Sequence, residues 1–169
     1  VHKHLAAQPR PLNTVKTYGA DGGRFGNNQD GLERWWRHVI GGAASARFHR
    51  PDSGLGLSEP AANSIRAARK LETLVRLWDL EPANELLRER EDNEAYAAAK
   101  PDVAYAMYFT NGGAVGLDLS QARGTFDVRW IDIRAGDWGR RETVEGGSTV
   151  TFRAPAPGHW LCCVCRRAP

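Results

Sequence analysis

Residues 44–51 (ASARFHRP) join a run of small side chains to a dense polar cluster of Arg47, His49 and Arg50. Such a cluster at the end of a strand suits an anionic or hydroxyl-rich ligand, because an arginine guanidinium can hold a carboxylate through two parallel hydrogen bonds. The alternative is a structural cluster in which Arg47 or Arg50 pairs with Asp52 or with another carboxylate. We predict a buried strand here, which delivers the three polar side chains to the rim of a pocket.

A strand, a loop and a helix are predicted before this cluster. Residues 11–18 favour a short strand, and residues 19–28, rich in glycine and asparagine, favour a loop. Asp30 has the position of a helix cap, with Glu33 at the spacing of a capping box. One apolar stripe runs along the helix and consists of residues 32, 35, 36, 39 and 40. The glycine pair at 41–42 ends the helix.

A second amphipathic helix follows the cluster. Ser58 is placed to cap it, and Pro60 fits its first turn. Apolar residues at helical spacing run from Ile65 to Trp78, and Pro82 bars continuation. The first half thus alternates strand, loop and helix twice, which is typical of parallel βα units. Two such units would leave apolar stripes exposed, notably at tryptophans 35, 36 and 78, so we expect them to need preceding units or a partner chain.

The second half of the chain has the pattern of β-strands. The charged residues 88–93 mark a predicted domain boundary, which divides the chain into residues 1–90 and 91–169. The hydrophobic period then changes to two, and turns recur about every ten residues, which favours a small antiparallel β-sandwich. Ile131 and Ile133 fall on the opposite parity from the preceding apolar residues, which indicates a β-bulge or a twist after Trp130.

The composition excludes several classes of protein. Hydrophobic residues make up 41% of the 169 residues, and the net charge of +3 is spread among mixed charges, so no nucleic-acid surface is indicated. No apolar run approaches the ~20 residues of a membrane span. Three cysteines near the C-terminus form neither a disulfide framework nor a complete zinc site, and we expect them to be small apolar residues of a terminal strand. No motif indicates a metal or a cofactor.

The first residues favour a chain that is part of something longer. Residue 1 is valine, and residues 1–9 look like the end of a helix that began earlier. We therefore expect a fragment or a processed chain, whose first half is completed by a missing upstream segment or by a partner chain.

Four blocks of the second half carry a family resemblance: residues 105–109 (YAMYF), 113–120, 129–136 and 157–160 (PGHW). Their order and spacing resemble the C-terminal β-sandwich, labelled as collagen-binding, of apiosidase-like (DUF4038-type) glycoside hydrolases. The first half, through residues 35–43, is similar to the last two βα units of that family's (β/α)8 TIM barrel. The resemblance covers roughly residues 11–164. It implies the C-terminal part of a secreted or periplasmic carbohydrate-active protein.

In a TIM barrel the active site lies at the C-terminal ends of the strands, so the loops after Tyr18 and Phe48 would reach it. The resemblance therefore implies that side chains from these two loops bind the sugar. The implied substrate-binding residues are Tyr18, Arg24, Arg47, His49, Arg50 and Asp52. The expected partner is an oligo- or polysaccharide.

Catalysis of glycoside hydrolysis usually needs two carboxyl groups, about 5 Å apart or ~6.5–9.5 Å apart. Barrels of this family place one at the fourth strand, which this chain lacks, and one at the end of the seventh. Residues 12–18, which would be the seventh strand, contain no glutamate, and the nearest acid is Asp21. Asp21 is therefore the catalytic candidate, with a plain turn residue as the alternative. We expect the full-length protein to be a glycoside hydrolase and this chain alone to be inactive. The alternative function is a non-catalytic β-sandwich that binds a partner.

Overall fold

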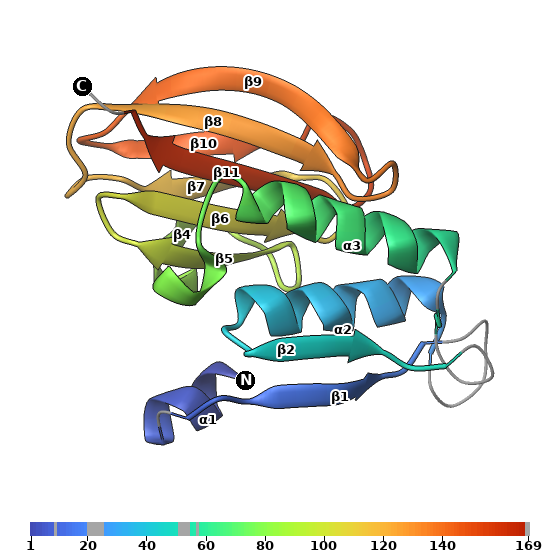
Figure 1. The fold of residues 1–169 in the computed structure, drawn as a ribbon. Helices are drawn as coiled ribbons and strands as arrows, with labels where there is room; N and C mark the ends of the chain where they lie inside the picture. The colour runs from blue at the N-terminus through green and yellow to red at the C-terminus, as the bar shows by residue number, and fades with distance from the viewer. Residues whose placement is uncertain (9, 20–25, 51–54, 57, 168–169) are drawn as a thin grey trace.

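The second half of the chain folds into antiparallel strands that form two sheets (Figure 1). The computed structural model describes residues 1–8, 10–19, 26–50, 55–56 and 58–167. The strands of this half are β3 (Glu81–Pro82), β4 (Leu87–Arg88), β5 (Ala95–Lys100), β6 (Ala104–Phe109), β7 (Ala114–Asp118), β8 (Thr125–Asp132), β9 (Asp137–Glu145), β10 (Thr149–Arg153) and β11 (Trp160–Arg166). The larger sheet has the order β3-β5-β6-β11-β8-β9, and the smaller has the order β10-β7-β4.

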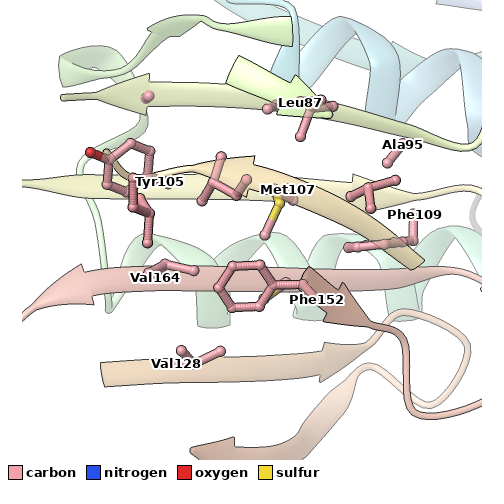
Figure 2. Packing of buried hydrophobic residues seen from close by; sticks show 14 of the residues in the cluster. Leu87, Ala95, Tyr105, Met107, Phe109, Val128, Phe152 and Val164 are labelled. Atoms are coloured by element: carbon pink, nitrogen blue, oxygen red, sulfur yellow. The ribbon is translucent and has the colours of Figure 1, made fainter. Parts of the chain in front are cut away.

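The core between the two sheets explains the period-two pattern. Tyr105, Met107 and Phe109 alternate along β6 and lie in one apolar cluster with Val128 of β8 and Phe152 of β10 (Figure 2). Successive side chains of a strand point to opposite faces, so every second residue of β6 enters this core. The predicted small antiparallel β-sandwich is confirmed.

Two helices cover the other face of the larger sheet. They are α2 (Asn28–Ile40) and α3 (Glu59–Glu72), and Figure 1 shows α3 lying along that face. Trp36 of α2 and Leu71 of α3 share a second apolar cluster with Ala106, Tyr108 and Leu161 of the sheet. Because both faces of the sheet are covered, every residue of β6 is buried. Strands that are buried on both faces have sequences that are continuous apolar runs, and β6 and β11 have this pattern.

The first half contributes a separate pair of strands. The strands β1 (Asn13–Thr17) and β2 (Ser45–Phe48) pair in parallel and lie on one side of α2, and the short helix α1 (His2–Ala7) precedes them (Figure 1). Ala46 and Phe48 are turned toward α2, where the Trp35 indole donates a hydrogen bond to the Ala46 carbonyl at 3.0 Å. Two single-turn 3₁₀ helices, η1 (Leu77–Asp79) and η2 (Asn84–Leu86), connect α3 to the sandwich.

The predicted fold class, the last βα units of a TIM barrel followed by a sandwich, is wrong. Among the described residues, β1 and β2 are the only parallel pair and form a sheet of two strands, while the nine other strands belong to the sandwich. The apolar faces of α2 and α3 pack on the larger sheet of the sandwich instead of on further βα units. Trp35 and Trp36, which were expected to be exposed without further βα units, are buried, and only Trp78 of the three is exposed, at 75%.

The strand of the polar cluster is also less buried than predicted. Ser45 and Arg47 of β2 are exposed, Ala46 is half-buried and Phe48 is buried. The strand therefore presents one face to α2, while its other face remains open within the described residues.

Candidate functional site

The ends of β1 and β2 bring two of the predicted residues together. Parallel strands end on the same side, and α2 begins there as well (Figure 1). Tyr18 follows β1 directly and His49 follows β2, and the centroids of their rings lie 4.8 Å apart with the planes tilted by 55°. The His49 amide donates to the Thr17 carbonyl at 3.1 Å, so the backbone pairing extends to the ring pair.

The backbone around this ring pair is held by α2. Arg34 Nη1 donates to the Tyr18 carbonyl at 3.2 Å, and the Gly56 amide donates to the His49 carbonyl at 2.6 Å. Gly19 has a φ of +145° and lies against Gly31 of the helix so closely that no side chain fits between them. Tyr18 is therefore fixed between the strand end and the first turns of α2.

The arginines of the predicted cluster lie on the exposed side of this site. Arg47 alternates with Phe48, whose ring stacks on Trp35 at 5.0 Å, so Arg47 is on the face of β2 away from α2. Arg50, the residue after His49, is exposed as well. The other predicted residues, Asp21, Arg24 and Asp52, lie outside the described residues, and so does the proposed pairing of either arginine with Asp52.

A cleft of about 490 Å³ lies where α2, α3 and the turns of the sandwich meet. Its lining includes Gln29 of α2, Glu59 of α3, Asn111 after β6, Arg134 after β8 and His159 before β11. These side chains provide hydrogen-bond donors and acceptors, and leucine, isoleucine and proline side chains add apolar surface. Such a mixed lining is typical of sites for small polar molecules.

His159 is a polar residue of this cleft to which the sequence assigned no role. It is 6% exposed, and its Nδ1 lies 2.9 Å from the Tyr108 hydroxyl oxygen. Burial raises the pKa of Tyr108, so the hydroxyl keeps its proton and can donate it to Nδ1. Burial lowers the pKa of His159, and Arg134 acts in the same direction, while Glu33 opposes them. A neutral ring that accepts at Nδ1 carries its proton on Nε2. The one sequence signal was a histidine inside the block PGHW.

A larger cleft, of about 900 Å³, lies at the opposite end of β2. It is lined mainly by apolar side chains of α2, β2 and α3, together with the exposed Trp78. None of the described residues predicted to bind substrate lines either cleft. The ring pair of Tyr18 and His49 is therefore a candidate site separate from both clefts.

The described residues contain neither a metal-binding cluster nor a helix that could span a membrane. In the part of the chain that the structure describes, no group of three or more histidine, cysteine, aspartate or glutamate side chains is arranged to hold a metal ion. Within the same residues, no helix combines the length and the apolar character needed to cross a membrane.

Stability should depend on pH because of a buried histidine, His159, and a half-buried one, His38. Burial lowers the pKa of His159, and burial, the N-terminal amine and Arg37 lower that of His38. Below about pH 6.5 the unfolded chain then binds more protons than the folded chain, so the free energy of unfolding should fall as the pH drops from about 7 to about 5. Aspartates with a lowered pKa contribute only at more acidic pH.

Urea unfolding at several pH values measures this effect. The variant His159→Gln should show a smaller loss of stability across the window, whereas replacing the exposed His4 by glutamine should leave the loss unchanged. Equal losses in all three proteins would show that His159 does not contribute.

Residues 82–161, which run from β3 into β11, match a family described as "Putative collagen-binding domain of a collagenase". No curated protein matches the chain. The chain is similar to a solved glycoside hydrolase family 5 protein from Bacteroides vulgatus, with a TM-score of 0.68 and 16% identity over 96% of this chain and 43% of that one. A second structure, titled "Glycoside hydrolase", has a TM-score of 0.72 and 14% identity over 100% of this chain and 45% of that one.

These similarities show the fold. The chain spans less than half the length of both solved structures. The family match covers the sandwich, and the two solved structures match both the sandwich and the first half.

Proposed function

We propose that the chain is part of a carbohydrate-active protein related to the apiosidase-like glycoside hydrolases. In this proposal the ends of β1 and β2 bind sugar, and the β-sandwich is an accessory unit. The observation that carries the proposal is the contact between the rings of Tyr18 and His49 at the two strand ends. The similarity of the whole chain to solved glycoside hydrolases supports it.

The chemistry of the ring pair suits a saccharide. A sugar ring has apolar C–H faces and a rim of hydroxyl groups, so it needs an aromatic surface beside hydrogen-bonding groups. Tyr18 and His49 provide both, because each carries an aromatic ring and a polar atom. Arg47 and Arg50 are exposed beside them and favour a sugar that carries a carboxylate, such as a uronic acid.

Three further assignments belong to this proposal. Asp21 is the candidate catalytic carboxylate, and Arg24 and Asp52 are candidate substrate-binding residues. Because hydrolysis usually needs a pair of carboxyl groups, we propose that the second comes from outside this chain and that the chain alone is inactive. The division into residues 1–90 and 91–169 also remains a proposal, although β3 and β4, which precede residue 91, already pair with sandwich strands.

Binding of a uronic-acid oligosaccharide, measured by isothermal titration calorimetry, tests the ring pair. We expect Tyr18→Ala and His49→Ala each to raise the Kd about tenfold or more, which corresponds to about 1.4 kcal/mol. The control is Arg141→Ala, which removes an exposed arginine from β9. Unchanged affinity in both ring variants, or an equal loss in the control, would contradict the proposal.

A second candidate function is a non-catalytic binding module. The match of residues 82–161 to a family described as collagen-binding favours it. In that case the chain should bind immobilised collagen, and binding should be unaffected by Tyr18→Ala. Binding to saccharide but not to collagen would exclude this candidate.

A further inference from the structure

The last strand places two cysteine sulfurs side by side. Cys163 and Cys165 are two residues apart on β11 and therefore point to the same face of the sheet. Their Sγ atoms lie 3.4 Å apart. Cys162 belongs to the core between the two sheets, on the opposite face. All three cysteines lie in the last strand, as predicted, and Cys162 and Cys163 belong to its two apolar clusters. The contact between the two sulfurs was not predicted.

The surroundings leave this pair, which we call the thiol pair, accessible from one side. Cys163 is buried, whereas Cys165 is only partly buried, and its thiol donates a hydrogen bond of 3.8 Å to the carbonyl of Leu74, two residues after α3. The residues directly opposite in β6 are Ala106 and Ala104, whose side chains are single methyl groups. Access to the thiol pair therefore runs past Cys165.

Strand β8 places one charged residue opposite each member of the thiol pair. Arg129 is opposite Cys163 in β8, while Asp127 is opposite Cys165 and is paired with Arg167 at 2.5 Å. The Arg129 guanidinium lies 4.7 Å from the Trp138 ring, and the Asp127 carboxylate is paired with Arg167, so both charged groups have partners other than the two sulfurs.

The strand geometry disfavours a disulfide between these sulfurs. Two residues along a strand are separated by about 6.6 Å, at the upper limit of the Cα separation in disulfides, and the sulfurs would have to close to about 2.05 Å. Hydrogen bonds to β6 and β8 hold β11 on both sides. A metal ion bound between the two sulfurs does not require them to approach to the length of a disulfide bond.

The thiol pair offers two sulfur ligands, and this number limits which metal ion can bridge them. A structural zinc ion takes four ligands, and the described residues hold no cluster of three or more metal-binding side chains. Soft thiolate ligands favour Cu(I), which is stable with two of them. We propose that Cys163 and Cys165 form a two-sulfur binding site for Cu(I). Binding forms two Cu–S bonds and releases the two thiol protons, with no change in oxidation state.

Competition with a chromogenic Cu(I) chelator, under reducing and oxygen-free conditions, tests this site. The wild-type chain should withdraw one Cu(I) ion and show thiolate-to-copper absorption in the near ultraviolet. Cys165→Ser and Cys163→Ser should each weaken the affinity at least about tenfold. Cys162→Ser is the matched control and should bind like the wild type.

Thermal unfolding of each variant shows whether it is folded. If the buried Cys163→Ser variant does not fold, the partly buried Cys165→Ser variant decides alone. The proposal is overturned if the wild type withdraws no copper, if Cys165→Ser binds as tightly as the wild type, or if Cys162→Ser loses the ion.

Discussion

Replacing Trp36 by alanine should lower the free energy of unfolding by about 3–5 kcal/mol, the usual cost of removing a large aromatic side chain from a core. Trp36 is completely buried. Its ring lies edge-on to Trp35 at 4.8 Å and stacks on Tyr108 of β6 at 5.9 Å. The side chain thus joins α2 to the larger sheet. Among the described residues its indole N–H has no hydrogen-bond partner, so the loss arises from packing.

Urea unfolding measures this loss, and Trp78→Ala is the matched control. Trp78 is 75% exposed, so its replacement should change stability by no more than about 0.5 kcal/mol. If both variants lost the same stability, the packing of α2 on the sandwich would be wrong. A single cooperative transition in the wild type is also expected, because the first half shares an apolar cluster with the sheet.

Gly19→Ala should cost at least about 3 kcal/mol. The φ of +145° disfavours any side chain at this position. A Cβ atom would in addition lie 2.5 Å from the Gly31 Cα and 2.7 Å from the Asn27 carbonyl oxygen, and both are backbone atoms that cannot rotate away. The end of β1 would have to move from α2. The Tyr18 ring would then lose its position beside His49, and saccharide affinity should fall as well.

Gly147→Ala separates the two causes of this loss. Gly147 has a φ of +98°, but a Cβ atom there would meet no atom within 4 Å. This control should therefore cost only about 1–2 kcal/mol, the price of the backbone conformation. Equal losses at the two glycines, measured by urea unfolding, would show that β1 and α2 are not in close contact.

The helix α2 was predicted from its apolar stripe, but its start was placed too late. The structure has Asn27 as the cap, and Asp30 is the third helical residue. The Asn27 side chain accepts from the Asp30 amide at 2.9 Å, and the Asp30 carboxylate accepts from the Asn27 amide at 2.9 Å. An aspartate can serve as cap or as the reciprocal partner, and the sequence alone does not distinguish these roles.

Most strands of the sandwich followed from alternation, but the irregularity predicted after Trp130 is not in β8. This strand pairs with β11 in regular register through Trp130 and Ile131, and these two side chains enter the apolar clusters on its two opposite faces. The register shift between β8 and β9 places the extra residue in β9. The strand β9 was missed. It is a charged edge strand in which no residue is buried, so it lacks the apolar period. Trp138 lies in β9, with the Lys70 ammonium 5.2 Å and the Arg129 guanidinium 4.7 Å from its ring.

The fold class was missed because local periodicity does not say which surface a helix covers. The βα pattern predicted β1, α2 and β2 correctly as elements. Their closure into a barrel depended on a resemblance, whereas the apolar runs of β6 and β11 already indicated a sheet covered on both faces. For the candidate site, position at a strand end predicted that Tyr18 and His49 lie near each other, and their rings are in contact. Long-range contacts such as the pair of Tyr108 and His159 have no local pattern in the sequence.

The most direct test of the sugar site is to follow the backbone amide resonances of the ¹⁵N-labelled chain during titration with a uronic-acid oligosaccharide and with its neutral counterpart. The proposed function predicts that the largest shifts occur at Tyr18 and His49, and that the acidic sugar binds more tightly because Arg47 and Arg50 stand beside them. Resonances of β9, around Arg141, should not move. Shifts confined to the sandwich, or none with either sugar, would contradict a carbohydrate site at the ends of β1 and β2.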